Sequence, residues 1–294
     1  MFVITGASGN LGRATATELA KQVGAGKIRL ASRSPEKLED LRAQGFETVR
    51  ADYDDPASLD AAYAGADRVL IISALDDAAD PMKRKRQHRA AIEAARKAGV
   101  KHIVYTSMVS PHPTTGPSLP DDHYDTELAL AQSGVPFTAL RNNIYADALV
   151  TMFLPGPLAT GSYMSSAREG RIAYVLRADC ARAAAAALVN PPADRSVVHV
   201  TGPDALSTRD LVELVRDVVG VDLKYVPVEA VAYREVLAGA GLPPPVADFV
   251  ISFDRMIADG FLGIATDDVA QLTGTAATSV RDFLTQNRAA LVPA

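Results

Sequence analysis

The chain begins Met1-Phe2-Val3-Ile4-Thr5-Gly6-Ala7-Ser8-Gly9-Asn10-Leu11-Gly12, an apolar run that ends in three glycines spaced three residues apart. An apolar run bounded by glycine is typical of a buried strand. The recurrence of Leu11, Ala14, Thr15 and Leu19 behind it is typical of a helix packed on that strand. The glycines therefore lie in a predicted strand-to-helix turn.

Strand-like and helix-like segments alternate through residues 1–150. The predicted strands are Val3–Thr5, Ile28–Ala31, Val69–Ser73, Ile103–Thr106 and Phe137–Leu140, with a further strand before Asp52. The predicted helices are Leu11–Val23, Pro35–Gln44, Pro56–Ala64, Met82–Ala98 and Asp121–Ser133. Parallel neighbouring strands need such crossovers, so this half predicts an α/β domain with a doubly wound parallel sheet.

Residues 151–294 are less regular, and we expect them to form a smaller α+β region that binds substrate. Helices are predicted at Asp179–Val189 and at Leu206–Val219, where Ser207 is the candidate N-cap. A strand predicted at Val197–Thr201 could return to the main sheet. Pro243-Pro244-Pro245 separates two further helical patterns.

Composition excludes several classes of protein. The 294 residues are 48% hydrophobic and 22% charged, which is typical of a globular protein. No apolar stretch approaches the roughly 20 residues of a membrane span, and the first apolar run lacks the basic flank of a secretory signal. The one cysteine, Cys180, allows neither an internal disulfide nor a cysteine-based metal site. We expect a cytoplasmic protein with no metal and no membrane partner.

The formal charge of −5 disfavours nucleic acid as a partner. The local exception is the basic run Lys83–Arg89, which lies at the start of the helical pattern that continues through Ile92 and Val100. This run could bind phosphate or form a solvated helix face, and its position in the helix favours the solvated face.

The glycine turn predicts dinucleotide binding. A diphosphate approaches a backbone closely only where side chains are absent, and the next helix offers unpaired N–H groups and a favourable dipole. Gly6 and Gly9 would permit that approach, while Gly12 would let the helix lie close to the strand. The Gly-x-x-Gly-x-x-Gly spacing departs from the commoner fingerprint, so the strand before it and the helix after it carry the prediction against a merely structural turn.

The end of the second strand favours NADP over NAD. An acidic residue there would bind the adenosine ribose of NAD, but the sequence is Ser32-Arg33-Ser34. Arg33 offers a cationic fork suited to a 2′-phosphate, unless it is simply an exposed residue at a strand end. Asp52, after the third strand, could meet the adenine amino group.

A proline-rich connection, Met108–Pro120, separates the fifth strand from the next helix. Its prolines and glycine exclude a continuous helix or strand. Long loops of this kind are often lids over a binding site, and the alternative is a surface connection.

Several segments together resemble the NmrA-like atypical short-chain dehydrogenase/reductases, especially the branch of NADPH-dependent quinone oxidoreductases type 2 and triphenylmethane reductases. They are Thr5–Gly12, Ala51–Asp55, Tyr105–Ser107, His123 with Thr126-Glu127, and Ser133–Asn142. The resemblance spans most of the chain. It implies a Rossmann nucleotide-binding domain, NADPH as cofactor, and hydride transfer to a small-molecule electron acceptor.

The resemblance also implies roles for single residues. It places Arg33 on the 2′-phosphate, and it places on the diphosphate Gly6, Ser8, Gly9, Asn10 and Leu11. Ser73 and Thr106 would lie near the nicotinamide ribose, and Asn142 and Asn143 would border the nicotinamide and the substrate. Each of these could instead be a polar residue that satisfies a strand end.

The catalytic pair of the wider superfamily, Tyr-x-x-x-Lys, is missing here. The tyrosine position falls on His123 and the lysine position on Glu127, one helical turn apart. The carboxylate could orient the imidazole and raise its pKa, which would make His123 a proton donor. Alternatively His123 bonds the nicotinamide amide or caps the helix. Tyr145 could form an aromatic wall of the substrate pocket or belong to the core.

The leading hypothesis is an NADPH-dependent reductase of quinones or similar electrophilic conjugated compounds. The alternative is an NmrA-like redox sensor that binds the dinucleotide without turning it over. A sugar-nucleotide epimerase would need the missing Tyr-x-x-x-Lys pair. The sequence leaves a homodimer open.

Overall fold

The structure is a computed structural model that describes residues 1–75, 77, 79–116 and 118–292. The chain divides into two compact units, each described by itself. The first unit comprises residues 1–142, 177–200 and 268–275, and the second comprises residues 143–176, 201–267 and 276–294. Among the described helices, none combines the length and the apolar character needed to cross a bilayer.

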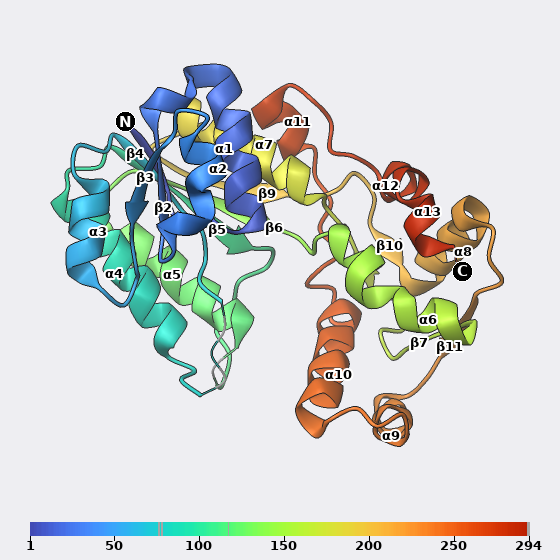
Figure 1. Ribbon diagram of the computed structural model, residues 1–294. Coiled ribbons are helices and arrows are strands. Elements are labelled where there is room, and N and C mark those ends of the chain that lie inside the picture. Colours follow the sequence, from blue (N-terminus) through green and yellow to red (C-terminus); the bar gives the residue numbers. More distant parts are fainter. Residues whose placement is uncertain (76, 78, 117, 293–294) are drawn as a thin grey trace. The chain divides into compact units, whose positions relative to one another are not determined.

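The first unit is built on a seven-stranded parallel sheet (Figure 1). In spatial order its strands are β3 (Glu47–Arg50), β2 (Ile28–Ser32), β1 (Phe2–Ile4), β4 (Arg68–Ile71), β5 (His102–Met108), β6 (Phe137–Asn142) and β9 (Arg195–Val200). The strand predicted near residue 197 is β9, which pairs parallel with β6. The predicted doubly wound parallel sheet is confirmed.

Helices cover both faces of this sheet. One face carries α3 (Pro56–Tyr63), α4 (Lys83–Lys97) and α5 (Leu119–Ser133), and the other carries α1 (Asn10–Val23), α7 (Arg177–Val189) and α11 (Asp268–Thr273). The predicted helix Pro35–Gln44 is shorter than expected, because it starts as the 3₁₀ turn Pro35–Leu38 and only Glu39–Arg42 is α-helical (α2). A second 3₁₀ turn, Ala25–Lys27, follows α1.

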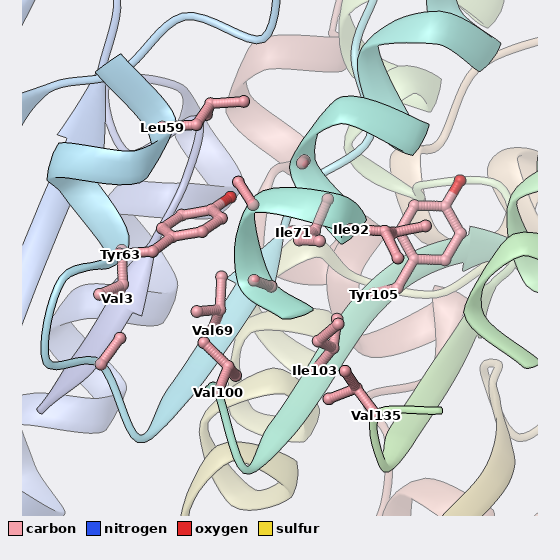
Figure 2. Packing of buried hydrophobic residues seen from close by; sticks show 14 of the residues in the cluster. Val3, Leu59, Tyr63, Val69, Ile71, Ile92, Val100, Ile103, Tyr105 and Val135 are labelled. Atoms are coloured by element: carbon pink, nitrogen blue, oxygen red, sulfur yellow. The ribbon is translucent and has the colours of Figure 1, made fainter. Parts of the chain in front are cut away.

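The core beneath α3, α4 and α5 is apolar and buried, as Figure 2 shows. Leu59 and Tyr63 of α3 and Ile92 of α4 pack over the strand residues Val3, Val69, Ile71, Ile103 and Tyr105. These strands are hydrophobic at nearly every position because both faces of a parallel sheet are covered. Their rigid packing fixes the carboxyl ends of the strands, where the candidate site lies.

The second unit has little sheet. β7 (Ser162–Ser165) pairs parallel with β11 (Lys224–Pro227), and β8 (Arg171–Ile172) pairs antiparallel with β10 (Leu206–Ser207). Its helices are a π-helical turn (Leu149–Phe153), α6 (Pro155–Thr160), α8 (Thr208–Val219), α9 (Ala230–Gly239), α10 (Pro244–Ala258), α12 (Val280–Gln286) and α13 (Arg288–Leu291). Ser207 caps α8 as predicted, in a capping box with Asp210.

Candidate functional site

The glycine loop between β1 and α1 is a tight turn against the helix. Gly6 has a φ of +60°, in the left-handed region that favours glycine, and its carbonyl accepts the Gly9 amide at 3.0 Å. A Cβ at Gly12 would lie 2.6 Å from the Gly6 oxygen and 2.7 Å from Ala7 Cα. The first turn of α1 therefore lies directly on the loop, as expected for Gly12.

The N-terminus of α1 is open. Its N-cap is Gly9, which makes no side-chain cap, and the amides of Asn10, Leu11 and Gly12 have no acceptor among the described residues. Side chains cap α3, α5, α8 and α12, while α4, α9 and α10 lack such a cap as α1 does, so it is the glycine loop before α1 that sets its N-terminus apart. Free amides at the positive end of a 14-residue helix fit a diphosphate.

The end of β2 is joined to this loop. Ser32 donates from its Oγ to Ser8 Oγ at 2.9 Å and accepts the Ser34 amide at 3.1 Å. Arg33, between the two serines, is exposed. It has no hydrogen-bond or ion-pair partner among the described residues.

The lack of a hydrogen-bond or ion-pair partner among the described residues distinguishes Arg33 from the other arginines of residues 1–96. Within residues 1–96 every other arginine bonds to a carboxylate or a carbonyl, and these are Arg13, Arg29, Arg42, Arg50, Arg68, Arg84, Arg86, Arg89 and Arg96. A guanidinium left free beside a diphosphate loop fits a 2′-phosphate.

The other predicted cofactor residues lie at or near the carboxyl ends of strands of the main sheet. The Ser73 amide donates to Thr106 Oγ1 at 2.9 Å, so the structure brings these two residues together. Asn142 ends β6, opposite Met108 of β5. Asp52 is partly engaged in its own turn, where its Oδ1 accepts the Asp54 amide at 3.0 Å.

Asn143 and Tyr145 belong to the second unit. The Asn143 side chain donates to the Leu262 carbonyl at 3.0 Å and accepts the Ile144 amide at 2.8 Å. It therefore ties the segment after β6 to the backbone at Leu262. Tyr145 forms an isolated parallel bridge with Val175 and is half-buried.

The predicted His123–Glu127 pair is wrong. Glu127 accepts a hydrogen bond from Ser107 Oγ at 2.7 Å and binds Arg141 through both carboxylate oxygens, at 3.0 and 2.7 Å. His123 is bonded instead to the Tyr105 hydroxyl, at 2.7 Å from its Nδ1. Burial, with help from the neighbouring His88 and Arg84, lowers the pKa of His123 well below its ordinary value rather than raising it.

The contacts around His88 guide the assignment of the tautomer of His123. The Ala74 amide can only donate, so His88 Nε2, 2.9 Å away, accepts, and neutral His88 carries its proton on Nδ1. That nitrogen faces Thr126 Oγ1 at 2.8 Å and the Tyr105 hydroxyl at 3.3 Å. Thr126 Oγ1 donates to the Asp122 carbonyl at 2.7 Å and so accepts the His88 proton, which leaves the Tyr105 hydroxyl free to donate. We assign this donation to His123 Nδ1, 2.7 Å away, and the His123 proton to Nε2.

The basic run Lys83–Arg89 is solvated only in part, because Arg86 and Arg89 are exposed while other residues of the run are buried. Arg84 is 6% exposed and pairs with Asp122 at 3.2 Å, and His88 is fully buried. The other cations of the run pair with carboxylates as well: Lys83 with Asp77, Lys85 with Asp121, Arg86 with Asp80 and Arg89 with Asp125. The signal that could have shown this is the acidic spacing Asp121-Asp122-x-x-Asp125 on the neighbouring helix, α5.

The functional residues that the sequence analysis missed are Tyr105 and His88. Both lie within apolar or basic patterns that gave no hint of a buried polar chain. Tyr105 is fully buried at the centre of β5 in Figure 2, where its alternation with core residues looks like ordinary packing.

The glycine loop lies at the carboxyl ends of β1 and β4, where the order of the strands reverses. Ligands of open α/β sheets bind at such a point. The fold and the open helix together define a dinucleotide-binding Rossmann-type protein. The family model described as NAD(P)H-binding matches residues 6–191. The chain belongs to this NAD(P)H-binding family.

Several relatives that match along nearly their whole length are named as oxidoreductases or reductases. The chain is 34% identical to quinone oxidoreductase 2 of Escherichia coli over 96% of both chains. The crystal structure of that enzyme with NADPH superposes with a TM-score of 0.88, covering 97% of this chain and 99% of the other. The Citrobacter triphenylmethane reductase with NADP(H) gives the same TM-score and coverage at 30% identity.

Proposed function

We propose that this protein is an NADPH-dependent reductase that delivers hydride to a quinone or a similarly electrophilic conjugated small molecule. The observation that carries the proposal is the uncapped N-terminus of α1 beside the unpaired Arg33. The names of its relatives, a quinone oxidoreductase, a triphenylmethane reductase and an NAD(P)H azoreductase, support the acceptor class.

Different residues of the first unit hold different parts of the cofactor. The amides of Asn10 to Gly12, with Gly6, Ser8 and Gly9, hold the diphosphate, and Arg33 holds the 2′-phosphate. Asp52 faces the adenine, and Ser73, Thr106 and Asn142 lie along the ribose and the nicotinamide. When bound, the reduced nicotinamide supplies the hydride.

His123 acts as a neutral hydrogen-bond donor rather than as an acid. With its pKa lowered by burial, the imidazole stays uncharged near neutral pH. Its proton on Nε2 orients the nicotinamide amide or the acceptor, and Tyr105 holds the ring in that state. A quinone needs little proton donation once it lies against the reduced ring, so positioning carries the rate.

A quinone panel tests this function directly. Purified protein is mixed with NADPH and a series of small quinones, and loss of the reduced-nicotinamide absorbance is followed. Turnover with at least one quinone is expected. NADPH binding without turnover of any acceptor would overturn the reductase and favour the redox-sensor alternative.

Two further properties belong to this proposal. A single buried cysteine suits a reducing compartment, so we place the protein in the cytoplasm. The partner is the small-molecule acceptor, and a homodimer is the oligomer to test, by light scattering on the purified protein.

A further inference from the structure

A short irregular connection follows β4 at the edge of the sheet where the order of the strands reverses. It comprises Ile72, Ser73 and Ala74, which belong to no helix or strand. A Cβ at Gly6 would lie 3.3 Å from Ile72 Cβ, so the glycine loop packs on this connection. Because irregular backbone lacks helical or ladder hydrogen bonds, its amides and carbonyls need other partners.

Side chains from three surrounding segments bond the first half of this connection. Thr5, directly after β1, accepts the Ile72 amide at its Oγ1 at 3.1 Å. The hydroxyl of Tyr53, in the turn after β3, donates to the Ile72 carbonyl at 2.8 Å. Thr106 of β5 accepts the Ser73 amide at 2.9 Å. The connection is therefore tied to both neighbouring strands and to the turn after β3.

The helix α4 holds the second half through a single residue. The Ala74 amide donates to His88 Nε2 at 2.9 Å, and the Ala74 carbonyl accepts from Arg84 Nε at 2.9 Å. Both side chains are buried, and Thr126 Oγ1 lies 2.8 Å from the other nitrogen of His88. Burial, with help from Arg84, lowers the pKa of His88 to about 3, so the ring stays neutral and its Nε2 remains an acceptor.

The groups that these contacts leave over belong to Ser73. Every amide of residues 72–74 and the carbonyls of Ile72 and Ala74 are bonded to side chains. The Ser73 carbonyl and the Ser73 hydroxyl bond to no other residue in the part of the chain that the structure describes. Since the peptides on both sides are fixed, these two groups are held in one orientation, as a preorganised binding site requires.

We infer that His88 is a positioning residue for the nicotinamide half of the cofactor. Through the Ala74 peptide it holds Ser73 so that the carbonyl and hydroxyl of Ser73 bond the ribose hydroxyls of that half. The inference rests on the proposed function, in which Ser73 lies along this ribose. His88 is fully buried and acts only through Ala74. Its loss should therefore weaken the nicotinamide half and spare the adenosine half, which Arg33 and the amides of α1 hold.

Calorimetric titration of the whole protein with two ligands tests this split. The ligands are NADPH and adenosine 2′,5′-bisphosphate, which carries the 2′-phosphate but has no nicotinamide half. In His88→Leu the Kd for NADPH should rise about five- to thirtyfold, the range for losing one or two hydrogen bonds, and that for the bisphosphate should not change. His88→Gln should restore tight NADPH binding, because its side-chain carbonyl can accept the Ala74 amide.

The matched control is His102→Leu. It removes another buried imidazole, which bonds to Thr138 at the opposite end of β5, so it should lower stability without changing either Kd. A second variant, Tyr53→Phe, keeps the ring and releases only the Ile72 carbonyl and Thr5. It should weaken NADPH and spare the bisphosphate, and it decides the question if His88→Leu does not fold.

The inference is overturned if His88→Leu weakens both ligands alike or weakens neither, or if His88→Gln binds NADPH as poorly as His88→Leu. Where His88→Leu does not fold, a Tyr53→Phe protein that binds NADPH like the wild type overturns it. A wild type that binds neither ligand would overturn the proposed function and this inference with it. Absence of quinone turnover would overturn the reductase alone, because neither titration depends on turnover.

Discussion

At the scale of single residues, the candidate site depends on groups that the protein leaves unsatisfied and on others that it satisfies in one way only. Arg33 is unpaired while the arginines around it are paired, so its charge remains available to a ligand. His123 is the opposite case, because its Nδ1 is hydrogen-bonded to the buried Tyr105 hydroxyl at 2.7 Å. An unpaired group such as Arg33 is available to bind a ligand, whereas a constrained group such as His123 positions one.

Replacing Arg33 by alanine should discriminate between the two nicotinamide cofactors. The guanidinium can bond the 2′-phosphate of NADPH, which NADH lacks, so the Kd for NADPH should rise about ten- to a hundredfold while that for NADH changes little. Calorimetric titration measures both. Arg42→Ala is the matched control, since Arg42 is exposed and pairs only with Glu39. Equal losses for both cofactors would contradict the assignment.

In the Tyr105→Phe variant, His123 should no longer be held in a single tautomer. The ring stays, but His123 Nδ1 loses its donor inside the core, which should lower the unfolding free energy by about 1–3 kcal/mol. Nitrogen NMR of the imidazole should show the proton on Nε2 in the wild type and a mixture in the variant. Tyr124→Phe removes a hydroxyl with no partner among the described residues and should alter neither reading. If the wild-type His123 carries its proton on Nδ1, the assigned donation from the Tyr105 hydroxyl to that nitrogen is wrong.

At the scale of elements, the site is a junction between a glycine loop and one helix, supported by a pair of helices on the opposite face. The close approach of α1 to the loop requires Gly12, and the free amides follow from the absence of a capping side chain. On the other face, α4 and α5 are tied by ion pairs that enclose His88. These contacts hold the ends of β4 and β5 in place.

Gly12→Ala should damage both stability and cofactor binding. Its Cβ would overlap the backbone of the loop at 2.6–2.7 Å, so α1 must shift, at about 1–3 kcal/mol for overpacking. Chemical denaturation and NADPH titration measure the two effects. Gly26→Ala, where an added Cβ meets nothing within 4 Å, is the control. A Gly12→Ala protein that binds NADPH normally would show that the close packing is dispensable.

The buried histidines should make the protein sensitive to mild acid. Burial lowers the pKa of His88 to about 3 and that of His102 to about 4, against 6.5 for the unfolded chain. The unfolded state then binds more protons, so stability is complete above about pH 6.5 and falls as the pH drops towards the folded values. For His88 alone the loss between about pH 7 and pH 5 is about 2 kcal/mol.

Denaturation at the two pH values measures this loss. The carboxylates with lowered pKa values titrate at lower pH, so they contribute little in this window. A protein equally stable at both values would mean that its histidines are not held neutral by burial.

At the scale of the whole molecule, the first unit could be predicted closely and the second only coarsely. The strands of the sheet are apolar runs separated by amphipathic helices, so local pattern specifies them, and the glycine loop follows from spacing. The contacts of His123 could not be predicted, because its partner comes from β5 and helical spacing suggested Glu127. The burial of part of the basic run Lys83–Arg89 could not be predicted for the same reason, since the carboxylates that pair with Arg84, Lys85 and Arg89 lie on α5.

The second unit escaped prediction because its chemistry is assembled from distant segments. Asp254, in α10, accepts hydrogen bonds from Ser165, at the end of β7, and from Ser166, almost ninety residues earlier in the chain. No local signal marks such a pair. The division into units also crosses the chain several times, which a linear boundary does not capture.

The central claim is that the open amides of α1 hold a dinucleotide diphosphate with Arg33 at the adenosine end. Calorimetric titration of the purified protein with NADPH and with NADH tests it most directly. Saturable binding of both, with NADPH the tighter, is the expected result. No detectable association with either reduced cofactor would contradict the account.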